Sequence, residues 1–178
     1  LYESTSNVFY LDLAINIINK IYSNTDENRG IEDVYRNNQS APVWSSTRYT
    51  DGNYHSFNCH TGFIVYVGAK IAHAMQDHEL PESYNAQGKE LTLKLINSFS
   101  FIENDWDSGM GYFQEPFVEN NNISTPLNMI SLCGLAALEL YNLTEDPKYY
   151  EYTERTATYI EQFLYLSDET YVWPYTPP

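Results

Sequence analysis

Apolar residues recur at helical spacing along most of the sequence, which predicts an all-α protein. Five helices are expected, over about residues 6–23, 61–75, 81–101, 127–141 and 147–166. The helices over 6–23, 81–101 and 147–166 have one apolar and one polar side, as surface helices do. In the first of them, the residues expected on the buried side are Phe9, Leu13, Ile17 and Ile21, with their neighbours Ala14 and Ile18.

The helices over 61–75 and 127–141 are apolar almost all round, so they must be covered on nearly every side. Each is followed by an amphipathic helix that opens with a proline, Pro81 or Pro147. The pair recurs at nearly constant spacing, which indicates helical-hairpin units over about 1–44, 60–106 and 126–173. Stacked hairpins place the apolar helices inside and the amphipathic ones outside. We therefore predict one all-α domain, an incomplete α/α toroid. The loops are too long for a tetratricopeptide-like solenoid.

The charge composition excludes two classes of binding partner. Lys and Arg total 9 against 24 Asp and Glu, so the formal net charge at pH 7 is −15. Nucleic acids and anionic membranes bind clustered cations, so neither is an expected partner. No apolar stretch approaches the roughly 18 residues that cross a bilayer. The acidic charge favours solubility, and we expect a secreted or periplasmic protein.

No metal or cofactor is expected. His55, Cys59 and His60 are close in the sequence, but they lack the paired spacing of a zinc site. Asp105 and Asp107 could hold calcium, although the EF-hand pattern is absent.

Three parts of the sequence carry a family resemblance. They are His60-Thr61-Gly62, the run from Leu127 through Gly134 and Tyr141 to Pro147 and Tyr149, and the closing Tyr171-Val172-Trp173-Pro174-Tyr175. These parts resemble α/α-toroid carbohydrate-active enzymes, which include polysaccharide lyases and uronyl epimerases. The resemblance covers about residues 40–178 and implies an oligo- or polysaccharide partner. Because such toroids have more hairpins, it also implies a fragment of a longer ring, a subunit of a homo-oligomer, or an open array.

Residues 44–60 hold the densest group of polar and aromatic side chains, just before an apolar helix whose N-terminal N–H groups favour anions. β-Elimination on a uronate needs a group that neutralises the carboxylate, a base for the C5 proton and an acid for the leaving oxygen. The resemblance to toroid lyases implies Asn58 and His60 for the first two roles, in either order. It implies a tyrosine as the acid, and Tyr54 is the candidate.

Further residues are candidates for holding the sugar. Aromatic rings pack on sugar faces, and polar side chains bond to sugar hydroxyls. Asn128 and His60 could instead cap their helices, and the tryptophans could serve packing. Uronate lyases usually line their cleft with cations, for which this region offers Arg36 and Arg48. The predicted substrate-binding residues are Trp44, Arg48, Tyr49, His55, Trp106, Tyr112, Asn128, Trp173 and Tyr175.

The leading hypothesis is a polysaccharide lyase, with two alternatives. A glycoside hydrolase on the same scaffold would use Asp105, Asp107 or Glu115 as its acid and base. The same Asp-x-Asp in a glycine-containing loop could instead organise a turn through bonds to the backbone. The other alternative is a non-catalytic glycan-binding or scaffold module.

Overall fold

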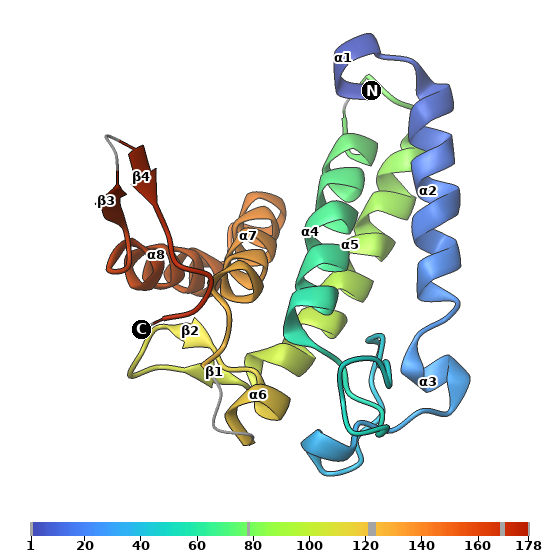
Figure 1. Cartoon of the computed structure of the whole chain (residues 1–178). Helices are drawn as coiled ribbons and strands as arrows, with labels where there is room; N and C mark the ends of the chain where they lie inside the picture. Colours follow the sequence, from blue (N-terminus) through green and yellow to red (C-terminus); the bar gives the residue numbers. More distant parts are fainter. Residues whose placement is uncertain (1, 78, 121–123, 168–169, 178) are drawn as a thin grey trace.

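The computed structural model describes residues 2–77, 79–120, 124–167 and 170–177 (Figure 1). The protein is mostly helical, as the apolar periodicity predicts. The long helices among these residues are α2 (Val8–Tyr22), α4 (Asn58–Met75), α5 (Glu82–Glu103), α7 (Leu127–Thr144) and α8 (Pro147–Glu161). The short ones are α1 (Tyr2–Thr5), α3 (Asp26–Arg29), the 3₁₀ helix η1 (Val34–Arg36) and α6 (Pro116–Asn120).

Two short antiparallel hairpins were not predicted. β1 (Trp106–Asp107) pairs with β2 (Tyr112–Phe113), and β3 (Tyr165–Ser167) pairs with β4 (Thr170–Val172). α8 therefore ends at Glu161, and the expectation that this helix reaches residue 166 is wrong. The segment beyond it is rich in Tyr, Thr and Val, which favour strands over helices.

The helix starts are fixed in different ways. The Asp146 side chain caps α8 by accepting from the backbone N–H of Lys148 at 3.0 Å, and Pro147 supplies the first turn. The residue before α7 is Pro126, and the one before α4 is Phe57. Neither offers a side-chain cap, so the capping alternatives for Asn128 and His60 are wrong. α4 also begins earlier than predicted, at Asn58.

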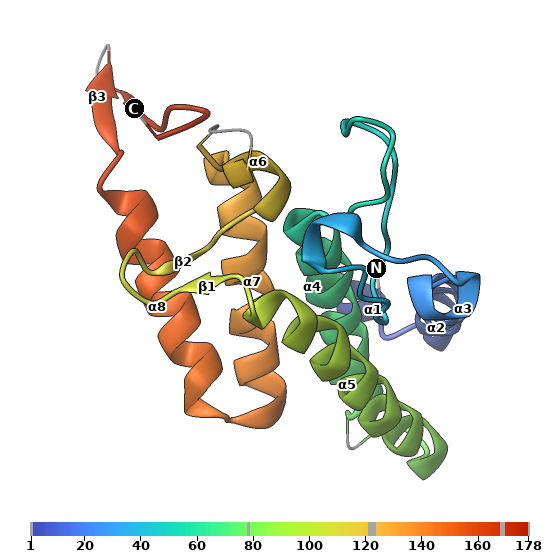
Figure 2. The ribbon, with the colours of Figure 1, turned by 90° about the horizontal axis from the view of Figure 1, so that it is seen from below.

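The apolar helices α4 and α7 lie side by side, each with its own amphipathic partner. α5 packs on α4 and α8 packs on α7, which gives the hairpins α4–α5 and α7–α8 (Figures 1 and 2). A Cβ atom at Gly62 would lie 3.2 Å from backbone atoms of Leu132 and Cys133. Farther along both helices, Lys70 Nζ is 3.8 Å from Glu139 Oε1. α4 and α7 therefore run in the same sense, with their N-terminal ends together.

α2 packs against the α4–α5 hairpin with a side that overlaps the predicted one only in part, because Ile18 is buried as expected. Its buried residues are Leu11, Ile15, Ile18 and Tyr22. Phe9, Leu13 and Ile17, expected to be buried, are 65%, 49% and 53% exposed. The apolar arc of this helix is wider than the surface that its neighbours cover, and only packing decides which part of such an arc is buried.

α7 corrects one expectation about membranes. Its 18 residues have a mean hydropathy of 1.2, so by length and composition alone the helix would be able to cross a bilayer. α7 packs between α4 and α8, so two of its sides are in contact with these helices.

Candidate functional site at the N-terminal end of α4

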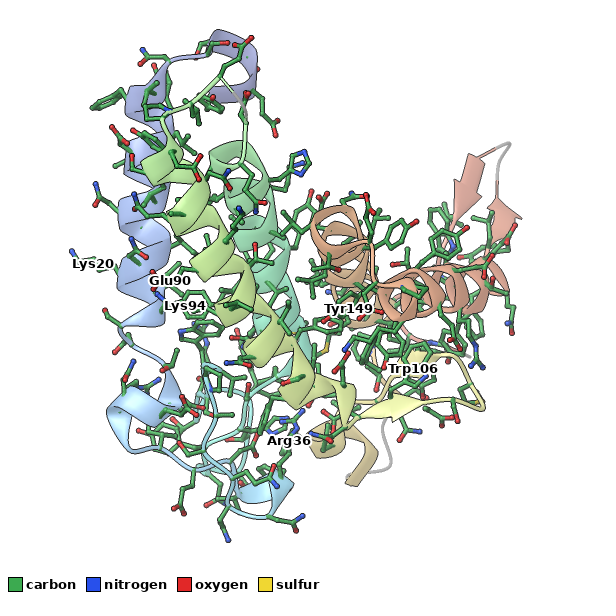
Figure 3. All side chains as sticks on the ribbon, turned by 180° about the vertical axis from the view of Figure 1, so that it is seen from behind. Lys20, Arg36, Glu90, Lys94, Trp106 and Tyr149 are labelled. Carbon is green, nitrogen blue, oxygen red and sulfur yellow. The ribbon has the colours of Figure 1, made fainter. Side chains whose placement is uncertain are left out.

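A buried group of charged and polar side chains lies where the loops meet the start of α4. Arg36, at the end of η1, is its centre and is labelled near the lower loops in Figure 3. The exposed fractions are 7% for Arg36, 2% for Asn58 and 0% for His55. We call this group the Arg36 network; it consists of Asp33, Arg36, His55, Asn58, Asp105 and Glu115.

The Arg36 guanidinium donates hydrogen bonds to three side chains of this network and to one backbone oxygen. Its Nη1 lies 2.6 Å from Asp33 Oδ2 and 2.7 Å from the backbone oxygen of Ser56. Its Nη2 lies 2.6 Å from Asp105 Oδ2 and 2.7 Å from Asn58 Oδ1. A planar guanidinium suits this task because its donors have a fixed fork geometry. Three separate segments of chain are therefore joined through one side chain.

His55 lies between two carboxylates inside the network. Its Nδ1 is 3.1 Å from Asp33 Oδ1, and its Nε2 bonds to Glu115 Oε1. Ionised carboxylates only accept, so both ring nitrogens donate and the ring is an imidazolium. Burial would lower the pKa of His55, but the bonds to Asp33 and Glu115 outweigh it and raise the pKa above 6.5.

The same contacts shift the pKa values of the carboxylates Asp33 and Asp105. Burial would raise the pKa of Asp33, but donation from His55, from the Ser56 N–H and from Arg36 lowers it to about 2. At Asp105 burial prevails, and the pKa is raised despite the neighbouring Arg36. Of Asp33 and Asp105, Asp33 is therefore the carboxylate that stays ionised to lower pH.

The network also fixes the first residue of α4. Glu115 Oε2 accepts from the Asn58 N–H at 2.7 Å, which satisfies one of the free donors at this helix start. The Asn58 Nδ2 donates to Asp105 Oδ2 at 3.0 Å and to the Gln114 backbone oxygen at 2.7 Å. Asn58, predicted as catalytic, is thus fully engaged within the protein. Its contacts hold the turn from which His60 projects.

A surface pocket opens beside this helix start. It has a volume of about 750 Å³ and brings together Trp44 and His60, two of the predicted site residues. Trp44 is half-buried and donates its Nε1–H to the Ile21 backbone oxygen at 3.0 Å. We call it the His60 pocket; its lining residues are Ile17, Lys20, Ile21, Ser23, Asn24, Trp44, His60 and Ile64.

His60 is exposed at this pocket, and its ring stands edge-on to Phe57, with ring centroids 5.4 Å apart. Neighbouring atoms remove part of the water around the ring, and this desolvation lowers the pKa of His60 below 6.5, against an opposing effect of Glu115. His60 is therefore neutral at pH 7 and can accept a proton. Lys20 supplies a positive charge on the same pocket, and it projects outward from α2 (Figure 3).

Other predicted residues lie in the loop before α4. The Arg48 guanidinium stacks over the ring of Tyr49 at 4.9 Å, and both side chains are exposed. Tyr54 is also exposed, with the Arg29 guanidinium 6.0 Å from its ring. These residues share a loop, but the His60 pocket does not include them.

The aromatic residues predicted around the two β-hairpins divide into two groups. Tyr112 is buried and stacks on Tyr159, while half-buried Trp106 packs against Phe113, so both rings serve interior packing. Trp173 and Tyr175 are exposed. The Tyr175 backbone oxygen accepts from the Leu127 N–H at 2.9 Å, which places Tyr175 at the start of α7, next to the exposed Asn128.

The carboxylates proposed for a hydrolase have structural partners. Asp107 Oδ1 accepts from the N–H groups of Gly109 and Met110 at 2.8 and 2.9 Å, which confirms the turn interpretation. Asp105 and Glu115 belong to the Arg36 network. The sequence interpretation missed this network, although the i, i+3 spacing of Asp33 and Arg36 was a usable signal. Among the described residues, no group of His, Cys, Asp and Glu has the arrangement of a metal site.

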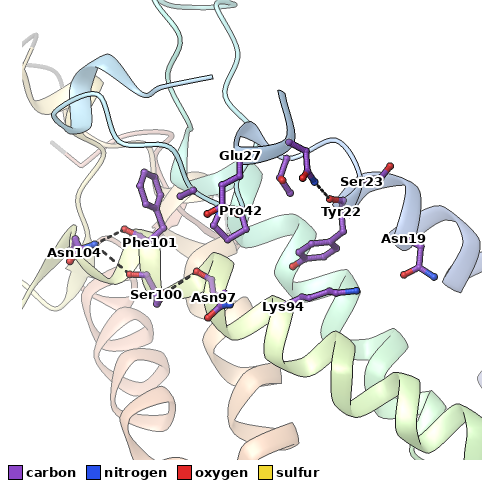
Figure 4. A pocket seen from close by; sticks show the side chains of 13 residues that line it. Asn19, Tyr22, Ser23, Glu27, Pro42, Lys94, Asn97, Ser100, Phe101 and Asn104 are labelled. Atoms are coloured by element: carbon purple, nitrogen blue, oxygen red, sulfur yellow. Dashed lines mark hydrogen bonds between the residues drawn. The ribbon is translucent and has the colours of Figure 1, made fainter. Parts of the chain in front are cut away.

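A larger hollow, of about 830 Å³, lies between α2, α5 and the loop around Pro42 (Figure 4). Amide and hydroxyl groups line it, and several already bond within the chain. Asn28 Nδ2 donates to the Tyr22 backbone oxygen at 3.0 Å, and Asn104 Nδ2 donates to that of Phe101 at 3.2 Å. None of the predicted site residues lines this hollow.

The His60 pocket is therefore the best candidate site, because a neutral imidazole, a cation and an aromatic side chain meet there. Comparison of the chain with protein families, with curated proteins and with solved structures finds no match.

Proposed function

We propose that the chain is a carbohydrate-active protein with α/α-toroid architecture, and that it cleaves a uronate-containing glycan by β-elimination. The observation that carries this proposal is the His60 pocket, which combines His60, Lys20 and Trp44. The two apolar helices also run in the same sense with amphipathic partners, as the inner helices of such an array do.

Each step of the elimination has a candidate in this chain. The Lys20 ammonium neutralises the substrate carboxylate and stabilises the charge that develops on it. Neutral His60 takes the C5 proton, the C5–H electron pair forms the C4=C5 double bond, and the C4–O bond breaks. The leaving oxygen receives a proton from an acid, for which Tyr54 remains the candidate. Trp44 offers an apolar contact for a sugar ring.

The hydrogen bonds of Asn58 change the role that we propose for it in the reaction. Both atoms of its side-chain amide are engaged, with Arg36, Asp105 and the Gln114 backbone. It is therefore a positioning residue that holds the first turn of α4, and His60 with it. Lys20 takes over the neutralising role, for which the sequence interpretation offered either Asn58 or His60.

The test is incubation with alginate, glucuronan and glycosaminoglycans while the ultraviolet absorbance of the unsaturated product is followed. His60→Gln should lower kcat by about 10²–10⁴-fold, because the base is lost. His73→Gln, an exposed change near the other end of α4, should leave kcat unchanged. The kcat/KM of the unaltered chain should rise with pH through an apparent pKa below 6.5, since His60 acts as the neutral base.

No absorbance change with any of these polymers, from folded protein, would contradict the lyase proposal. Glycan binding that survives His60→Gln without turnover would instead identify a binding module. Equal losses in the His60→Gln and His73→Gln variants would remove His60 from the mechanism.

A further inference from the structure

The hollow between α2, α5 and the loop around Pro42 has no part in the proposed elimination (Figure 4). Its volume of about 830 Å³ is in the range of sites that bind small molecules, about 300–1,000 Å³. We call it the Asn97 hollow; the lining residues that characterise it are Asn19, Tyr22, Glu27, Pro42, Asn97 and Phe101.

Two side-chain amides reach the Asn97 hollow from different helices. Asn19 belongs to α2 and Asn97 to α5, and both side chains are exposed (Figure 4). Neither amide forms a hydrogen bond with another described residue. Each amide offers an oxygen that accepts and an NH₂ group that donates, so it suits a ligand with hydroxyl groups.

Apolar rings line the deeper part of the same hollow. Tyr22 and Phe101 are buried, and Pro42 is half-buried. The Tyr22 ring is fixed in place, because its hydroxyl is 3.2 Å from the Ser98 hydroxyl and its edge meets the Trp44 ring. Rigid rings of this kind pack against the C–H face of a sugar, while polar groups around them bond to its hydroxyls.

The charges in the Asn97 hollow favour a neutral ligand. Its lining residues include one acid, Glu27, and one base, Lys94. The Lys94 ammonium already lies 2.7 Å from Glu90 Oε1 on the preceding turn of α5. The hollow therefore offers no excess positive charge to an anion, unlike the His60 pocket, where Lys20 stands without a carboxylate among the lining residues.

The Asn97 hollow adjoins the His60 pocket at the C-terminal end of α2. Ser23 lines both. Lys20 belongs to the His60 pocket and its neighbour Asn19 to the hollow. Trp44 of the pocket and Tyr22 of the hollow are in contact, with ring centroids 5.2 Å apart. A glycan chain that passes Ser23 can therefore occupy both.

We propose that the Asn97 hollow binds a neutral sugar of the glycan whose uronate lies in the His60 pocket. Asn19 and Asn97 bond to the hydroxyls of this sugar, and Tyr22 and Phe101 contact its apolar face. The substrate class is then a heteropolymer in which uronates adjoin neutral sugars, and a uniform polyuronate fits less well. The link to a uronate rests on the proposed function, whereas the binding of a neutral sugar in the hollow does not.

The first test is a titration followed by NMR. Linear tetrasaccharides of β-linked glucose, mannose, xylose and N-acetylglucosamine are added to the isotope-labelled His60→Gln chain, which keeps every lining residue of the hollow. At least one of them should shift the side-chain amide signals of Asn19 and Asn97 until saturation. The signal of Asn142, at the far end of α7, should not move. If none of the four shifts the Asn19 and Asn97 signals, the proposal is overturned.

A matched pair of variants tests the contact itself. Asn97→Leu should weaken binding of the tetrasaccharide by about two- to tenfold, the effect of losing one hydrogen bond. Asn16→Leu makes the same change at an exposed residue of α2 outside the hollow, and its affinity should equal that of the unaltered chain. Circular dichroism checks that both variants fold. Undiminished binding by Asn97→Leu, or an equal loss in both variants, overturns the proposal.

Turnover separates this proposal from the lyase proposal. With hyaluronan, in which glucuronate alternates with a neutral sugar, Asn97→Leu should raise KM at nearly constant kcat, whereas His60→Gln lowers kcat. Turnover with a KM that Asn97→Leu leaves unchanged overturns the shared glycan. Tetrasaccharide binding without turnover of any uronate polymer contradicts the lyase and the link to a uronate, and it supports the hollow as a site for neutral sugars.

Discussion

Buried charged side chains hold the loops of this protein in place. The Arg36 network gathers three carboxylates around the two cations Arg36 and His55, almost out of contact with water. Removing charges from water is costly, and close, multiply bonded partners offset that cost only when all of them are present. Loss of one charge would therefore leave a buried partner uncompensated. The network ties η1, the start of α4 and the β1–β2 hairpin into one unit.

His55 makes stability depend on pH. Its pKa is raised above 6.5 in the folded chain, so its contribution is fully present below 6.5 and is lost as pH rises through the folded value. We expect His55→Gln to lower the free energy of unfolding most at mildly acidic pH. The difference from the unaltered chain should shrink in alkaline solution. Urea unfolding at acidic, neutral and alkaline pH measures it.

The control for this pH series is His73→Gln, a change at an exposed histidine of α4. That variant should follow the unaltered chain at each pH. A His55→Gln difference that grows with increasing pH would contradict the imidazolium assignment, because the sign of the linkage would be reversed.

At the scale of the elements, the close contact of α4 and α7 organises the fold. Gly62 has no side chain, which allows the backbone of α4 to approach that of α7 at Leu132 and Cys133. Gly134 makes a similar approach possible between α7 and α8, where an added Cβ would lie 2.8 Å from Thr156 Cγ2. Small residues at the crossing points thus set the distances within and between the hairpins.

Gly62→Val should separate these two helices. The added side chain meets backbone atoms, which cannot rotate away, so we expect a loss of about 1–3 kcal/mol in the free energy of unfolding. Ala86→Val, which also introduces valine but on the exposed side of α5, should cost under about 1 kcal/mol. Urea unfolding compares the two variants. If Gly62→Val proves as stable as the unaltered chain, α4 and α7 are farther apart than described.

For the whole molecule, the charge is the dominant feature. A net charge of −15 on 178 residues produces repulsion that works against the compact state and against binding of a polyanion. The His60 pocket has one cationic side chain among its lining residues, Lys20, which would favour a substrate carboxylate at the proposed site.

Added salt should stabilise the folded chain at neutral pH. Ions screen repulsion between exposed charges beyond about 10 Å at 0.1 M, whereas the buried Arg36 network is screened much less. We expect the thermal midpoint to rise with sodium chloride and to level off, as calorimetry can measure. Near the pI of about 4.4, where the net charge vanishes, the effect should be much smaller. A midpoint that falls with salt at neutral pH would show that exposed ion pairs outweigh the repulsion.

The sequence by itself determined the helical class, the five long helices and the alternation of apolar and amphipathic types. These follow from local periodicity, from prolines at helix starts and from the hydrophobic requirement that all-round apolar helices be covered. It also selected Trp44 and His60, which do share a pocket.

Only the tertiary structure decided what depends on contacts between distant residues. Arg36 meets Asp105, and His55 meets Glu115, across long stretches of sequence that no periodic pattern connects. The side-chain amide of Asn58, a predicted catalytic residue, is likewise occupied by Arg36, Asp105 and the Gln114 backbone. The packing of α2 left Phe9 and Leu13 open, because a wide apolar arc does not specify which part is covered. Local pattern sets what each element is, whereas three-dimensional packing sets which side chains meet.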